Sequence, residues 1–71
     1  MEPREQFARN LRALREEKGL SIEALGDAAG LHFTQVSRYE RAVREPKVTA
    51  IVRLAHGLGV APARLFDGME S

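Results

Sequence analysis

The chain has 71 residues, of which 44% are hydrophobic, and it contains no cysteine. A chain of this length has enough apolar residues for one modest core, so we expect a single domain over residues 1–71. The absence of cysteine excludes disulfides and thiolate metal sites, and no apolar run approaches the roughly 20 residues that a membrane helix needs. The N-terminus also lacks the apolar stretch of a signal peptide, which favours a cytoplasmic protein.

The formal net charge of +1 is distributed unevenly along the chain. Residues 38–53 contain five basic and two acidic side chains, a local charge of +3, so the rest of the chain carries −2. A basic segment of this kind is either an ordinary solvated face or a surface that attracts phosphates. Charge alone leaves both interpretations open.

Helix signals recur from the N-terminus onward, whereas strand signals do not. Pro3 suits the first position of a helix that runs to about Lys18 with apolar residues on one face. Ser21 can cap a second helix over residues 22–29, and Gly30 can end it. The first third of the chain therefore predicts two helices with a short connection between them.

The remaining segments predict three further helices. A third helix is expected over residues 33–41, and Pro46 separates it from a fourth over residues 48–58. The apolar periodicity of the fourth helix places Val48 on its buried stripe. Because Pro62 suits a first helical turn, a short fifth helix is expected after it. The sequence thus predicts an all-α, compact five-helix domain.

The connection between the second and third helices has a more specific pattern. Two helices joined by about three residues must cross steeply, as they do in the helix-turn-helix unit. Gly26 costs about 1 kcal/mol in a helix interior relative to alanine, which makes sense if the two backbones approach each other there. Gly30 can adopt the left-handed conformation that turns the chain. We therefore predict a helix-turn-helix over residues 21–41.

Three stretches carry a resemblance to a known family, namely "LRALREEKGLSIEALGDAAGL", "TQVSRYERAVREP" and "IVRLAHGLGVAPARLF". Residues 7–66 resemble the repressor-type (Cro/repressor, xenobiotic-response-element) helix-turn-helix family of small bacterial and phage transcription regulators. The resemblance implies a lambda-repressor-like domain whose third helix enters the major groove of double-stranded DNA. It also implies a homodimer on an operator that is an inverted repeat.

Two positions depart from the family pattern. Ala42 stands where the family usually has glycine, so a left-handed cap after the third helix would be strained or replaced. Ile22 stands where relatives often have a glutamine that touches phosphate, so that side-chain contact is missing. Backbone N–H groups at the start of the second helix can still face a phosphate.

The outward face of the third helix is polar once Val36 is set inward. In the major groove Arg38 can bond a guanine, Gln35 an adenine, and Thr34 a base edge or a thymine methyl. The angular position of Phe33 lies between core and groove, so half-buried packing stays open beside the base contact that the resemblance implies. The predicted base-contact residues are Phe33, Thr34, Gln35, Ser37 and Arg38.

Other polar residues are expected to hold the DNA backbone. Phosphate contacts position a protein on DNA and make its affinity fall with salt concentration. The candidates lie at the start of the second helix, at the start of the third helix and in the basic segment that follows it. The predicted phosphate-contact residues are Ser21, His32, Arg41, Arg44 and Lys47.

The resemblance also assigns two structural roles. The family pairs an arginine late in the first helix with the glutamate that closes the third, and Arg15 and Glu40 stand at the matching positions. Members commonly dimerise through their C-terminal helices, where this chain has apolar residues that can form a two-fold patch. The alternative is that Leu65 and Phe66 close the core of the monomer. The predicted dimer residues are Val60, Leu65, Phe66 and Met69.

Two other classes of function were weighed. An enzyme has little support, because the sequence shows no metal-spaced cluster, no glycine-rich phosphate loop and no activated nucleophile. We therefore expect no catalytic residues, no cofactor and no metal. A protein-interaction module is the better rival, since small repressor-like domains also serve as antitoxins, in restriction–modification systems or as the DNA-binding part of a longer regulator. The sequence excludes none of these roles, and a toxin or other protein partner stays possible.

Overall fold

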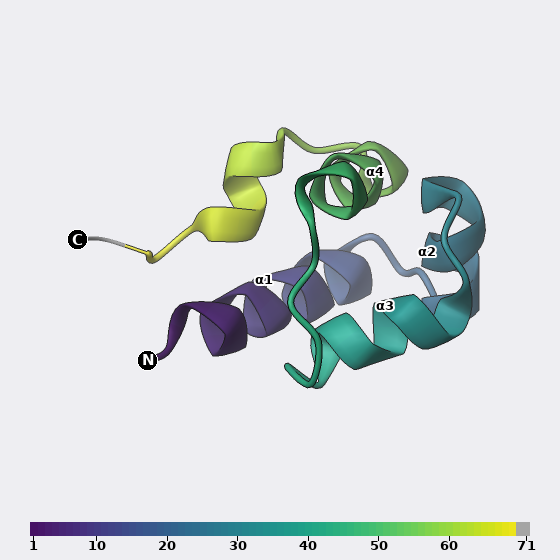
Figure 1. Ribbon diagram of the computed structural model, residues 1–71. Helices are drawn as coiled ribbons and strands as arrows, with labels where there is room; N and C mark the ends of the chain where they lie inside the picture. Colours follow the sequence, from purple (N-terminus) through teal and green to yellow (C-terminus); the bar gives the residue numbers. More distant parts are fainter. Residues whose placement is uncertain (70–71) are drawn as a thin grey trace.

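Four α-helices and one 3₁₀-helix follow one another along residues 1–69, the part of the chain that the computed structural model describes (Figure 1). They are α1 (Pro3–Glu17), α2 (Ile22–Ala29), α3 (Phe33–Glu40), α4 (Val48–Leu58) and the 3₁₀-helix η1 (Pro62–Phe66). The all-α prediction is confirmed for this part of the chain, where no strand occurs. No helix in residues 1–69 is long and apolar enough to cross a membrane.

The prediction of a fifth α-helix is corrected. The segment after Pro62 forms only the five residues of η1, and the chain then leaves it in an extended conformation at Asp67. Short helical pieces often adopt the tighter 3₁₀ form, because too few residues are available to close successive α-helical hydrogen bonds. The domain therefore has four α-helices and a short closing turn.

The local signals at the ends of α2 act as the sequence predicts. The Ser21 hydroxyl accepts the N–H of Ala24 at 3.0 Å and so caps the helix. Gly30 ends α2 with φ of 71°, and the N–H of Leu31 donates to the carbonyl of Gly26 at 2.8 Å. A left-handed glycine at this point turns the chain sharply into α3.

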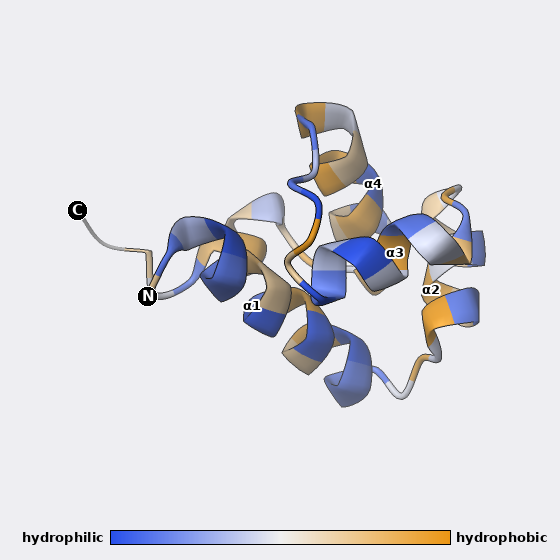
Figure 2. Cartoon of the chain, turned by 60° about the horizontal axis from the view of Figure 1, so that its bottom comes forward, coloured by the Kyte–Doolittle hydropathy of each residue, from blue (hydrophilic) through white to orange (hydrophobic). Residues whose placement is uncertain are grey.

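The core draws apolar side chains from every helix. In space α2 packs on both α3 and α4, while α1 packs on α3 and on η1. Hydrophilic residues run along much of α1 and α3 in Figure 2. The five largest side chains that are fully buried are Leu11, Leu25, Val36, Leu54 and Leu65.

The predicted buried stripe of α4 is wrong at one residue, Val48. Val48 is 76% exposed, whereas Ala50, Leu54 and Leu58 are buried. Successive helical residues turn by about 100°, so Val48 lies about 200° from Ala50 and points away from the core. The stripe of α4 therefore begins at Ala50.

Gly26 sits where α2 approaches the turn and the start of α3. A Cβ atom added there would lie 2.7 Å from the carbonyl oxygen of Leu31 and 3.4 Å from the Cα of Phe33. The first distance is shorter than real Cβ contacts allow, and the obstructing atom belongs to the backbone, which cannot rotate away. The predicted close approach of the two helices is confirmed.

We expect Gly26→Ala to lower the free energy of unfolding by about 1–3 kcal/mol, because the overpacking outweighs the better helix propensity of alanine. Urea denaturation measures the change. Ala28→Gly, at an exposed site of the same helix, is the control and should cost about 1 kcal/mol through propensity alone. A Gly26→Ala protein at least as stable as the wild type would contradict the steric role of this glycine.

Candidate nucleic-acid interface

The start of α3 is organised by a capping box. The Nδ1 atom of His32 accepts the N–H of Thr34 at 3.2 Å, and the N–H of His32 donates to Oε1 of Gln35, also at 3.2 Å. Phe33 is 45% exposed, and its ring stacks on His32 with centroids 4.7 Å apart. Phe33 thus packs on a neighbouring side chain at the surface and not in the core.

The inner face of α3 is anchored by Val36, which is fully buried, and by Tyr39, which is 7% exposed. Its outer face is polar, with Gln35 and Arg38 exposed and Thr34 and Ser37 partly exposed. A hollow on this side is shared with the beginning of α2. The predicted contact residues that line it are Ser21, Phe33, Thr34, Ser37, Arg38 and Arg41.

Three basic side chains lie on the other flank of α3. Arg44, Lys47 and Arg53 border a second hollow between α3 and α4, together with Gln35. Four of the five predicted phosphate-contact residues therefore fall into two groups, one on each side of the outer face of α3, while His32 borders neither hollow. Cations placed on both flanks suit a helix that lies between two strands of phosphates.

Arg53 was not assigned a contact by the sequence, although it belongs to the basic segment 38–53. Its Nη1 donates to the carbonyl of Gly30 at 3.3 Å, which links α4 to the turn between α2 and α3. The uneven distribution of charge along the sequence had placed Arg53 in the basic segment 38–53. Its position beside the turn depends on how α4 packs across α2, which the sequence does not show.

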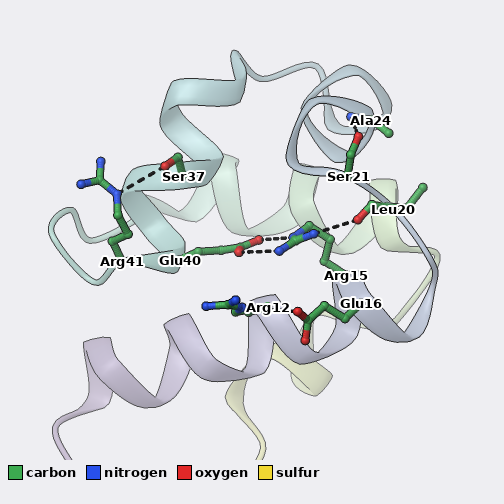
Figure 3. Close-up of polar contacts among 9 residues, drawn as sticks. All are labelled: Arg12, Arg15, Glu16, Leu20, Ser21, Ala24, Ser37, Glu40 and Arg41. Carbon is green, nitrogen blue, oxygen red and sulfur yellow. Dashed lines mark hydrogen bonds and ion pairs between the residues drawn. The ribbon is translucent and has the colours of Figure 1, made fainter.

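Arg15 and Glu40 form the predicted ion pair between α1 and α3 (Figure 3). Nε of Arg15 lies 2.6 Å from Oε2 of Glu40, and Nη2 lies 3.0 Å from Oε1. Nη1 donates to the carbonyl of Leu20 at 2.9 Å. The side chains are 13% and 6% exposed, and the hydrogen bond to Glu40 raises the pKa of Arg15 against an opposing effect of burial. The pair fastens the end of α3 to α1.

The left-handed cap after α3 is kept despite the absence of glycine. Ala42 has φ of 59°, and its N–H donates to the carbonyl of Tyr39 at 3.2 Å. The N–H of Val43 donates to the carbonyl of Arg38 at 3.1 Å, which completes a Schellman-type ending. The first of the two predicted alternatives, a strained cap, is the one that occurs.

The candidate dimer residues fall into different environments. Leu65 is fully buried, so its assignment to a dimer surface is corrected and the alternative of a core role holds for it. Phe66 is 41% exposed, with its ring 5.7 Å from that of Phe7 between centroids. Val60 and Met69 are partly buried against the core. Only Phe66 among the four presents a large exposed side chain.

Comparison with known proteins identifies the motif that α2 and α3 form. The helix-turn-helix domain family matches residues 6–66. The chain belongs to the helix-turn-helix domain family. Its helix-turn-helix is α2, the turn at Gly30 and α3. The family is one of regulators and not of enzymes.

Two known regulators are similar to this helix-turn-helix chain over most of its length. Control protein C.SmaI of Serratia marcescens is 32% identical over 66 residues, which is 93% of this chain and 79% of that protein. The HTH-type transcriptional regulator y4dJ of Sinorhizobium fredii is 35% identical over 65 residues, or 92% of this chain and 84% of that protein. The predicted resemblance to helix-turn-helix transcription regulators is confirmed.

A solved structure agrees with this helix-turn-helix assignment. The restriction–modification controller protein C.AhdI of Aeromonas hydrophila superposes with a TM-score of 0.87 and 38% identity. The match covers 89% of this chain and 96% of that protein. The arrangement of the helices is thus shared with a regulator of nearly the same length.

Proposed function

We propose that the protein regulates transcription by binding double-stranded DNA sequence-specifically, with α3 in the major groove. The observation that carries the proposal is the outer face of α3, which is polar and exposed and has basic side chains on both flanks. The Arg15–Glu40 pair and the buried Val36 hold this face of α3 in one orientation.

The proposed contacts divide by position. Arg38 makes no side-chain hydrogen bond within residues 1–69, so its guanidinium is available to guanine, and Gln35 can reach adenine. Thr34, Ser37 and Phe33 lie beside them. The backbone at Ser21 together with Arg41 would hold phosphates on one flank. Arg44 and Lys47, with Arg53 beside them, would hold phosphates on the other.

We expect Arg38→Ala to weaken binding to a cognate duplex by about 1–3 kcal/mol while leaving binding to random duplexes nearly unchanged. The cognate sequence comes from selection out of a random duplex pool, and fluorescence anisotropy measures both affinities. Lys47→Ala is the matched control, which should weaken all duplexes alike and reduce the salt slope by about one unit. Equal losses on cognate and random DNA would remove Arg38 from the base contacts.

A homodimer on an inverted repeat is the second part of the proposal. One recognition helix of eight residues reads few base pairs, and the local charge of +3 neutralises few phosphates, so a monomer should bind weakly. Phe66 borders an apolar hollow with Pro46, Ile51 and Met69, and Val60 lies partly buried on the same core. This surface would supply an isologous contact, with half-site centres about 34 Å apart.

Phe66→Ala should lower DNA affinity more than it lowers monomer stability, because much of the ring is exposed and contributes only part of its area to the core. Analytical ultracentrifugation and thermal unfolding at two protein concentrations separate the effects. Val43→Ala, at another exposed apolar site, is the control. A chain that is monomeric while it saturates a single non-palindromic half-site would refute the dimer.

The similarity to C.AhdI favours one biological role among those left open. That protein is a restriction–modification controller, and this chain is 38% identical to it over 89% of its own length. We propose the same kind of role here in preference to an antitoxin. Restriction and methyltransferase genes beside the coding sequence, with the selected operator upstream of one of them, would support it. A neighbouring toxin gene whose product binds the purified chain would favour the antitoxin instead.

A further inference from the structure

Three of the five proposed base-contact residues have their side chains held by one neighbour, His32. Its Nδ1 atom lies 2.8 Å from the hydroxyl of Thr34, and its backbone N–H donates to Oε1 of Gln35 at 3.2 Å. Its ring stacks on Phe33 with an interplanar angle of 29°. One residue outside the outer face of α3 therefore sets the geometry of side chains on that face.

The hydrogen bonds fix which proton His32 carries. The backbone N–H of Thr34 can only donate, and it points to Nδ1 at 3.2 Å, so Nδ1 must be the unprotonated, accepting nitrogen. The Thr34 hydroxyl lies 2.8 Å from the same Nδ1 atom, so the backbone and the side chain of Thr34 both contact this nitrogen. The side-chain oxygen of Thr34 is thereby held in place at the start of α3.

We infer that His32 is a positioning residue for base readout, which orders the side chains of Phe33, Thr34 and Gln35. This inference rests on the proposed function.

Among residues 1–69 the His32 ring has hydrogen bonds to Thr34 alone. Arg53 of α4 lies near this corner, but its Nη1 donates to the carbonyl of Gly30, two residues before His32.

Two matched variants separate positioning from the phosphate contact that the sequence assigns to His32. His32→Asn keeps an acceptor near the place of Nδ1, so it retains the helix cap while removing the ring. His32→Gln carries an amide N–H near the place of Nε2, so it can still donate to a phosphate but does not reproduce the cap. A positioning residue tolerates asparagine better, and a phosphate ligand tolerates glutamine better.

The main experiment measures base preference at each half-site position, as affinity ratios among singly substituted duplexes. Thr34→Val identifies the position whose preference depends on the Thr34 hydroxyl. We expect His32→Gln to reduce the preference at that position about tenfold, whereas His32→Asn should retain most of it. A loss of affinity in His32→Gln that is equal on all duplexes would overturn the positioning role.

A second measurement needs no DNA. In the free protein at one pH, His32→Gln should lower the protection of the Thr34 amide against hydrogen exchange, whereas His32→Asn should keep most of it. A Thr34 amide that is equally protected in both variants would overturn the role of His32 alone. A Thr34 amide that loses protection in His32→Gln, in a protein that binds no selected duplex, would instead overturn the proposed function, and the readout role with it.

Discussion

Replacing Glu40 with alanine should lower the free energy of unfolding by about 3–5 kcal/mol. Arg15 would keep its charge in a site where its side chain is only 13% exposed, and it would lose both short contacts to the carboxylate. Its remaining hydrogen bond, to the carbonyl of Leu20, cannot neutralise the charge. Since small domains are stable by only about 5–15 kcal/mol, this change should bring the protein near the point of unfolding.

Chemical denaturation of the variant measures this loss, and the exposed pair of α1 provides the control. Arg12 and Glu16 lie 3.4 Å apart with side chains 66% and 58% exposed, so Glu16→Ala should cost less than about 1 kcal/mol. Arg15→Met with Glu40→Leu removes both charges and should recover much of the stability lost by Glu40→Ala. Similar costs for Glu40→Ala and Glu16→Ala would show that the partly buried Arg15–Glu40 pair has no special role.

Leu65→Ala should lower the free energy of unfolding by about 2–5 kcal/mol, because it empties a fully buried position where η1 closes over α1 and α4. The loss should be independent of protein concentration, since Leu65 has no exposed area to give to a second chain. Thermal unfolding at several concentrations measures it.

The control for Leu65 lies next to it in η1. Arg64 is half exposed, in an ion pair with Asp67, and Arg64→Ala should change stability by less than about 1 kcal/mol. If the Leu65→Ala protein had normal stability but no longer self-associated, Leu65 would be a dimer residue and not a core residue.

The sequence by itself determined the features that depend on residues close together in the chain. Ser21 caps α2 through a residue three positions away, and Gly30 turns the chain with its own backbone. Such contacts form in any fold that contains the segment, so they can be predicted without knowing the packing. The pairing of Arg15 with Glu40, 25 residues apart, was predicted only through family resemblance.

The tertiary structure decided the environment of residues that look alike in the sequence. Val48 and Leu65 are both apolar residues within predicted helices, yet one is 76% exposed and the other is fully buried. Helical periodicity gives the relative angles of side chains along one helix. It does not say which angle faces a neighbouring helix, because that depends on how distant segments cross.

The same reason applies to the crossing of α2 and α4 and to the start of α3. A Cβ atom at Gly57 would lie 3.0 Å from the backbone nitrogen of Ala29, a contact that no local pattern announces. Likewise a phosphate contact was predicted for His32 from the sequence, and only the placement of its ring shows that Nδ1 contacts Thr34. Local hydrogen bonding thus determined where the helices begin and end, while the packing of distant segments and the placement of individual side chains decided which residues are buried and which remain available to DNA.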